Sequence, residues 1–415
     1  MSRPRCSAAL RGLPRSYLAL LVGQTISLLG SNVTMLALPL TAITLLDAGP
    51  AQTGLLLACG RAPYLVVSLF AGVVVDRLPH RRILLTANLV MAATLATIPL
   101  FASLGRLGLV QLYTTSMLVG VAAVISDVAY LACIPTVLNR SQLVRAQSSL
   151  ELSQAGAMAA GPFLAGWLVD QFSAPTAILA DSVSFLVAAA LLSRVPMRNA
   201  GCSRAAPSAL LGQVAEGLAS VFGNPILRAV TLASGTFIFW HNAYSAAFLL
   251  HLTKDLGFDS RVVGMMLGIG ALGGVVGAAS SPRAGRAIGL GPTLMIGLAV
   301  SAGGMSLAAL FTQPWWAAVA CVTLSQFMLW IGQGIYNVQQ VPIRYALVQP
   351  HLQGRINASI RSVVWGLASL GALAGGAAAA ATSLRTTLLA SSVLGLASIV
   401  WIWRSPLRHA RSLRL

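Results

Sequence analysis

Runs of apolar residues long enough to cross a membrane recur along the whole chain. About 20 consecutive apolar residues in a helix cover a hydrocarbon core of roughly 30 Å. The pattern predicts an all-α membrane protein with about twelve transmembrane helices, arranged as two bundles of six. The expected ranges are 17–46, 51–75, 83–103, 107–133, 151–172 and 175–193, then 226–252, 262–282, 290–311, 315–342, 359–382 and 386–403. The first run is too long to be a cleaved signal peptide, so we expect it to remain as the first helix.

The composition supports a membrane protein and argues against a soluble enzyme. Hydrophobic residues make up 57% of the chain and charged residues only 9%, with a mean hydropathy of +0.81. A soluble domain carries roughly a quarter charged residues. The sequence has no Walker motif and no paired His–Glu metal site, and its five cysteines lack metal-binding spacing. We therefore expect no enzymatic activity, metal or cofactor; a membrane-embedded enzyme or sensor is the less favoured alternative.

A segment rich in Arg, Ser, Gly and Pro divides the chain near its middle. It predicts an N-terminal bundle over 1–195, a cytoplasmic linker over 196–225 and a C-terminal bundle over 226–415. Apolar residues at helical spacing in the linker predict a short helix on the membrane surface. These residues are Leu210, Leu211, Val214, Leu218, Val221 and Phe222. Helices five and eleven share a pattern in one register, which favours a carrier built from two repeated halves.

The basic residues determine the expected topology. The net charge is +18, and most basic residues lie in the two termini, the linker and the loops after helices two, four, eight and ten. Only Arg106, Lys254, Arg261 and Arg385 are expected on the other side. The positive-inside rule then places both termini in the cytoplasm, in a multi-pass protein of the inner cell membrane. Because no soluble basic domain exists, nucleic acid is not an expected partner.

The loop after helix two carries a specific motif. Gly72 is followed by Asp76 and Arg77, and after a short turn by Arg81 and Arg82. This pattern resembles motif A of the major facilitator superfamily, although Leu-Pro-His replaces the usual turn glycine. The resemblance implies alternating access and a gating clasp formed by these residues. It also implies that Asp127 in helix four pairs with the motif arginine, and that Asp76 faces Arg361 at the start of helix eleven.

Two further patterns resemble the efflux branch of that superfamily. Gly161, Pro162 and Gly166 in helix five are similar to part of motif C, which is seen in proton antiporters. Small residues of this kind also allow ordinary close helix packing. The sequence from Ala180 to Phe185 looks like that of macrolide and siderophore exporters. The basic residue that some drug antiporters carry in helix four is absent.

Placing an ionisable side chain at the centre of the membrane costs about 2.5–3.5 kcal/mol of free energy or more. We therefore expect each ionisable residue within the spans to have a structural or functional role. Asp127 is expected in the clasp, with proton transport as the alternative. Arg61 has no partner nearby in sequence, which favours either an anionic substrate group or a buried pair. Asp181 lies in a helix that the resemblance places at the periphery, so we expect a packing role. His241 can titrate near neutrality and joins Arg61 and Asp127 as a coupling candidate.

Polar and aromatic residues at helical spacing mark the expected substrate cavity. In the family that the chain resembles, helices one, four, seven and ten line the central path. The candidates on these helices are Gln24, Ser31, Tyr113, Trp240, His241, Tyr244, Trp330, Gln333, Asn337 and Gln340. The alternative is that these faces hold helices together. Neutral amides and aromatic rings suit a bulky, moderately apolar solute.

The function expected from these patterns is secondary active transport, with the proton gradient as energy source. The substrate would be a hydrophobic or amphipathic small molecule of the drug, natural-product or siderophore type, exported by a monomeric carrier. Uptake or facilitated diffusion is the alternative within transport, because the sequence does not encode direction.

Overall fold

The structure is a computed structural model that describes residues 14–138, 142–195, 216–217, 219–310, 313–348 and 353–410. Its regular elements in these ranges are helices. The first half contains α2 (Arg15–Leu45), α3 (Pro50–Arg61), α4 (Pro63–Arg77), α5 (His80–Ser103), α6 (Leu109–Val137), α7 (Leu143–Gln171) and α8 (Ala174–Ser193). The second half contains α10 (Pro225–Leu250), η2 (His251–Asp255), α11 (Ser260–Ile288), α12 (Leu290–Ser306), η3 (Leu307–Ala309), α13 (Trp315–Leu347), α14 (Gln353–Ala381), α15 (Leu384–Gly395), α16 (Ser398–Trp403) and η4 (Pro406–His409).

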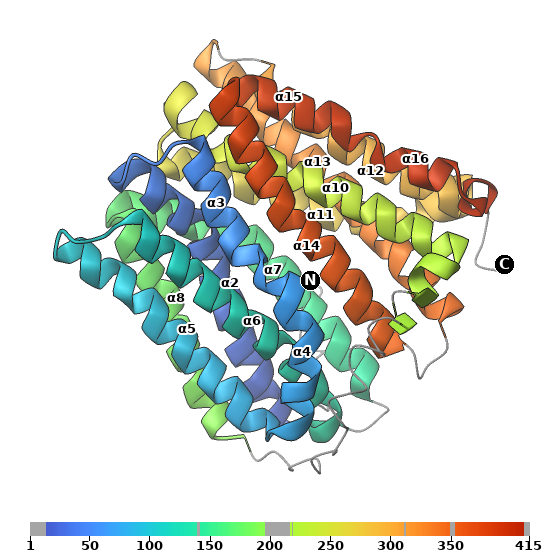
Figure 1. Ribbon diagram of the computed structural model, residues 1–415, viewed down its shortest axis with the longest axis horizontal. Coiled ribbons are helices and arrows are strands. Elements are labelled where there is room, and N and C mark those ends of the chain that lie inside the picture. The colour runs from blue at the N-terminus through green and yellow to red at the C-terminus, as the bar shows by residue number, and fades with distance from the viewer. Residues whose placement is uncertain are drawn as a thin grey trace, which may run out of the picture.

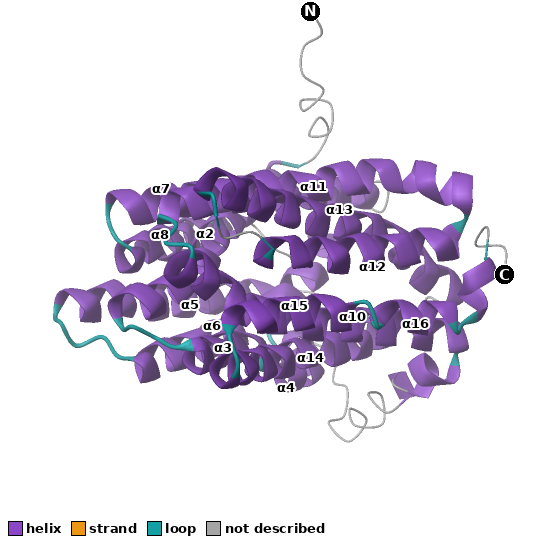
Figure 2. Ribbon diagram, turned by 90° about the horizontal axis from the view of Figure 1, so that it is seen from above, coloured by secondary structure: helices purple, strands orange, loops and turns teal. Residues whose placement is uncertain are grey.

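The helices form two bundles, one from each half of the chain. In Figure 1 the bundle of α2 to α8 lies at the left and the bundle of α10 to α16 at the right. Within the first bundle α2 and α5 pack on α8, and within the second α11 and α12 pack on α13. Figure 2 shows the helices of both bundles running in roughly one direction. The predicted all-α architecture of two bundles is confirmed.

Successive passes alternate in direction, which defines two ends of the molecule. We call the end where α2 begins and α16 finishes the terminal end, and the opposite one the distal end. Among the described residues, nine stretches are long and apolar enough to cross a membrane. The expected second helix is interrupted at Ala62, between α3 and α4, because Pro63 has no N–H to donate. The expected twelfth helix is likewise divided into α15 and α16.

Glycines bring the two halves together near the distal end. Helix α3 packs on α14, and α7 packs on α11. A β-carbon added to Gly54 would lie 2.8 Å from the Cα of Gly376, and one added to Gly166 would lie 2.9 Å from the Cα of Gly264. Backbones meet directly at both places, as small residues permit in membrane proteins. In Figure 1 the two bundles diverge from this region toward the lower right.

An ion pair also joins the halves at the distal end. The Nζ of Lys254 in η2 lies 2.6 Å from the Oδ1 of Asp47, in the loop after α2. The hydrogen bond and the charge of Lys254 lower the pKa of Asp47 below its usual value. A lowered pKa means that the pair is fully present above the ordinary pKa and is lost only as the pH falls through the lowered one. This contact therefore persists across the physiological pH range.

The predicted linker lies mostly outside the described residues. Leu210, Leu211, Val214 and Leu218 are among those not described. Residues 216–217 and 219–223 are helical. Val221 is buried with Leu227 of α10, Val348 and Ile360 of α14, so the end of the linker packs onto the second bundle.

Candidate functional site

An ion pair joins the two halves inside the protein, on the terminal-end side of its middle. Asp127 comes from α6, and Arg361 comes from α14. The Nη2 of Arg361 lies 2.5 Å from the Oδ2 of Asp127, and the hydroxyl of Tyr64 in α4 donates to the same oxygen at 3.3 Å. The guanidinium also lies 5.4 Å from the centre of the Tyr64 ring. Both charged side chains are 38% exposed, so the pair is half-buried and reachable by water.

A second contact between the same helices lies one turn from Tyr64. The hydroxyls of Ser68 and Ser362 are 2.6 Å apart, and Ser68 also donates to the carbonyl oxygen of Tyr64. We call the five residues Tyr64, Ser68, Asp127, Arg361 and Ser362 the central clasp. Its members come from α4 and α6 on one side and from α14 on the other, so any separation of the halves at this depth must break it.

Arg61 finds its partner in an aromatic ring of the other half. Its guanidinium lies 4.7 Å from the centre of the Trp365 ring in α14, and the Trp365 and Tyr64 rings are 5.6 Å apart. Cation–π contacts of this kind are worth about 0.5–2 kcal/mol, depending on exposure to water. Tyr64 and Trp365 are not among the residues predicted from the sequence. The signal was present in α14, where Arg361, Ser362 and Trp365 share a face at i, i+1 and i+4.

The loop that resembles motif A is described only in part. The surroundings of Gly72 and the side chain of Asp76 are not described by the structure. Contact between Asp76 and Arg361 therefore stays a prediction. The described partners of Arg361 are Asp127 and Tyr64. Arg81 donates to the carbonyl oxygen of Ser193 at the end of α8. Arg77 and Arg82 are exposed.

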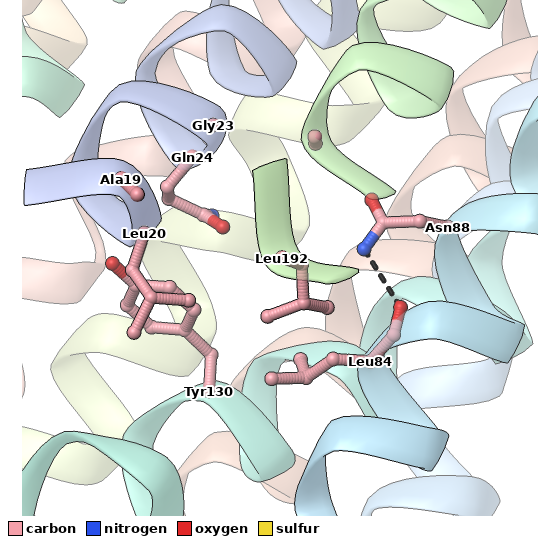
Figure 3. Close-up of a pocket in the computed structure, with 9 residues that line it drawn as sticks. Ala19, Leu20, Gly23, Gln24, Leu84, Asn88, Tyr130 and Leu192 are labelled. Atoms are coloured by element: carbon pink, nitrogen blue, oxygen red, sulfur yellow. Dashed lines mark hydrogen bonds between the residues drawn. The ribbon is translucent and has the colours of Figure 1, made fainter. Parts of the chain in front are cut away.

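The predicted cavity residues of the first half lie in different environments. Gln24 lines a small pocket among α2, α5, α6 and α8, together with Asn88 and Tyr130 (Figure 3). Ser31 is exposed on α2. Tyr113 is partly buried against the apolar core. The pocket thus lies inside the first bundle rather than between the halves.

The candidates on α10 are surrounded by aromatic rings. His241 stacks on Phe237, with ring centres 5.9 Å apart, and its buried Nδ1 has no hydrogen-bond partner in the described part of the chain. Trp240 meets Phe239 edge to face at 5.0 Å. Tyr244 is only 1% exposed, and its hydroxyl accepts a hydrogen bond from Gln326 of α13 at 3.4 Å. Tyr244 therefore packs α10 against α13 in this conformation.

Amides form a ladder along α13. Gln340 donates to the Oδ1 of Asn337 at 3.0 Å, and Arg344 donates to the Oε1 of Gln340 at 2.5 Å. Asn337 is exposed, while Gln333 and Trp330 are half-buried one and two turns away. Polar groups that bond along their own helix keep further hydrogen-bonding capacity for a solute.

Alanine at Asn337 is expected to weaken transport without reducing the amount of protein in the membrane. One lost hydrogen bond costs about 1 kcal/mol, or roughly a fivefold rise in the half-saturating solute concentration. Gln339 provides a matched control, because its amide donates to the carbonyl oxygen of Ser281 in α11 at 2.8 Å. Gln339→Ala should reduce abundance and leave specific activity unchanged. The opposite pattern for the two variants would show that the ladder holds helices together.

The glycines of the motif in α7 contact two different helices. The helix continues through Pro162. A β-carbon at Gly161 would lie 2.3 Å from the Cβ of Asn32 in α2, whereas Gly166 faces Gly264 of the other half. One face of this motif thus packs within the first bundle, and the other forms part of the contact between halves.

The chain belongs to the Major Facilitator Superfamily, whose family model matches residues 20–322. It is 25% identical over 380 residues to the multidrug efflux pump Tap of Mycolicibacterium fortuitum, covering 88% of this chain and 89% of that protein. The protein is therefore a multi-pass membrane protein of a transporter family.

Solved structures show the same fold at low sequence identity. The nucleoside transporter NupG matches with a TM-score of 0.74 and 12% identity, over 94% of this chain and 99% of that one. A bacterial homologue of the iron transporter ferroportin, 17% identical, matches with a TM-score of 0.68 in its inward-facing state, over 94% and 99% of the two chains. Its outward-facing state gives 0.60 over 94% and 98%.

Proposed function

We propose that the protein exports a hydrophobic or amphipathic small molecule in exchange for protons that enter the cell. The observation that carries the proposal is the central clasp, in which an ionisable pair joins the two halves within the spans. A proton on Asp127 removes the charge that holds Arg361, so proton binding changes the contact that must break when the halves move. The described efflux activity of Tap favours export over uptake.

We also propose that the protein lies in the inner membrane of the cell and that its terminal end faces the cytoplasm. Most of the basic residues that the structure describes in the loops and at the helix ends belong to that end, as the positive-inside rule requires. The solute would bind between the halves, where Arg61, Trp365 and His241 offer a cation, aromatic rings and an unpaired imidazole nitrogen. Such a site suits a planar or aromatic solute that carries a polar or anionic group.

The proposal is tested in everted membrane vesicles with a fluorescent amphipathic dye. Respiration acidifies the lumen, so an exporter coupled to protons should accumulate dye there, and a protonophore should abolish the accumulation. Vesicles that contain Arg361→Ala protein at equal abundance are the control and should accumulate less. Dye transport that does not depend on the proton gradient would indicate a facilitative carrier. Loss of dye from the lumen would indicate uptake, and chemical change of the dye without movement would indicate an enzyme.

A further inference from the structure

A carboxyl group is buried inside the first bundle, away from the contact between the halves. Asp181 of α8 is 1% exposed. Thr34 of α2 donates to its Oδ2 at 2.6 Å, and the hydroxyl of Ser184 lies 3.1 Å from its Oδ1 and 2.7 Å from its main-chain carbonyl oxygen. Gly30 makes room for the group, because a β-carbon there would lie 2.6 Å from the Oδ1. This surrounding is specific for a carboxyl group and exceeds what packing requires.

None of the described contacts of Asp181 is with a cation. The helices packed on α8 are α2, α5 and α7. Their titratable residues are Arg15 and Tyr17 at the terminal end of α2, His80, Arg81 and Arg82 at the terminal end of α5, and Arg145, Glu151 and Asp170 in α7. Asp170 lies at the distal end of α7, where Gln171 donates to it, and the Arg and Glu lie toward the terminal end. A carboxylate in a membrane interior without a cation is costly, and such a group takes up a proton instead of remaining charged.

The hydroxyls around Asp181 can serve both of its protonation states. The hydroxyls of Thr34 and Ser184 can each rotate to donate to a carboxylate or to accept from a carboxylic acid. Protonation therefore requires no rearrangement of the helices at this point. The carboxyl group can therefore gain and lose a proton in place.

Polar groups on α2 extend from this site toward the terminal end. Gln24, Ser27 and Ser31 follow one another at about one-turn intervals on one face of α2, and Ser31 is exposed. Gln24 reaches the pocket of Figure 3, where the buried hydroxyl of Tyr130 has no hydrogen-bond partner in the described part of the chain. Groups one turn apart are about 5.4 Å apart along the helix, a separation that single water molecules bridge.

We propose that Asp181 is a proton-binding site of the transport cycle, and that the polar face of α2 conducts its proton to the terminal end in this conformation. The inference rests on the proposed proton-coupled function. On loading, a hydronium ion transfers its proton to the carboxylate and leaves as water. On release, the carboxylic acid returns the proton to water near Ser31 or to the pocket that Gln24 lines.

The test uses the full-length protein in liposomes, with an amphipathic dye as the probe. Two rates are compared: accumulation of dye driven by a proton gradient, and exchange of dye across the membrane without a gradient. Asp181→Asn keeps the size and the hydrogen bonds of the side chain but cannot bind a proton. We expect accumulation to fall at least about tenfold and exchange to remain within about twofold of the unaltered protein. Ser182→Ala is the matched control, because the hydroxyl of Ser182 donates to Ala92 of α5 instead of to the carboxyl group.

A second variant applies if Asp181→Asn fails to reach the membrane. Thr34→Val removes the donor at 2.6 Å and keeps the shape, so the midpoint of the pH profile for accumulation should move to higher pH by about one unit. Ser182→Ala should leave this midpoint in place. Unaltered protein without proton-driven accumulation would refute the proposed function itself. If the unaltered protein is coupled, equal coupling in Asp181→Asn, or an unmoved profile in Thr34→Val, would overturn the proton site alone.

Discussion

Alanine at Gly166 is expected to hold the halves apart at the distal end and to reduce transport strongly. The added β-carbon would lie 2.7 Å from the carbonyl oxygen of Ser260 and 2.9 Å from the Cα of Gly264. Backbone atoms of two packed helices cannot yield as a flexible side chain does, and overpacking costs about 1–3 kcal/mol. The ratio of distal-open to distal-closed protein should therefore rise by about 5- to 150-fold.

Pulsed electron paramagnetic resonance measures this shift directly. Spin labels at Arg106→Cys and Arg261→Cys, both exposed at the distal end, report the separation of the halves in a cysteine-free background. Gly156→Ala is the matched control in the same helix, because no other atom lies within 4 Å of its added β-carbon. Equal distance distributions for the two alanine variants would contradict the glycine contact as the distal closure.

Asparagine at Asp127 is expected to widen the terminal end. It removes the negative charge opposite Arg361 and leaves a half-buried guanidinium without its counter-ion. Removing one partner of an exposed ion pair costs little free energy, and removing one partner of a fully buried pair costs about 3–5 kcal/mol. For this half-buried pair we expect a cost of about 1–2 kcal/mol. The population should shift about 5- to 30-fold toward the form in which the halves are separated at this depth.

Spin labels at Arg194→Cys and Arg286→Cys, both exposed near the terminal end, follow this separation. Arg361→Gln should act in the same direction, and the double variant should show less than the sum of the two effects because both residues form one contact. Lys254→Gln is the control, since it breaks the exposed ion pair at the distal end and should leave the terminal-end distances unchanged. Additive effects of the two clasp variants would show that the pair does not hold the halves together.

Most of the fold could be predicted from the sequence because lipid imposes a simple rule. A span must be apolar, helical and about 20 residues long, so each pass is visible in a single stretch of sequence. The break at Ala62 was overlooked although Pro63 marks it. Membrane helices commonly tolerate proline, so the residue alone does not decide between a continuous helix and a broken one.

The partners of the charged residues could not be predicted in the same way. Arg361 meets Asp127 because α14 docks against α4 and α6 of the other half, and docking depends on the shapes of both bundles. Asp181 was expected to have a packing role, yet it is enclosed by hydroxyls. The residues that surround Asp181 come from two segments, Gly30 to Thr34 in α2 and Asp181 to Ser184 in α8. The sequence does not show that these two helices are in contact, so the site could not be predicted from either segment alone.

The interruption between α3 and α4 has a mechanical consequence. Upstream of it, α3 is pressed against α14 through Gly54; downstream of it, α4 carries Tyr64 and Ser68 of the central clasp. Ala62 keeps helical backbone angles, but Pro63 lacks the N–H that would bond to the preceding turn, so the helix bends more easily here than at an uninterrupted turn and α4 can tilt while α3 stays packed on α14. We therefore expect α3 and α4 together to act as an elastic link between the distal and terminal ends. The stiffness of this link limits how far the halves can separate at one end before the other end moves.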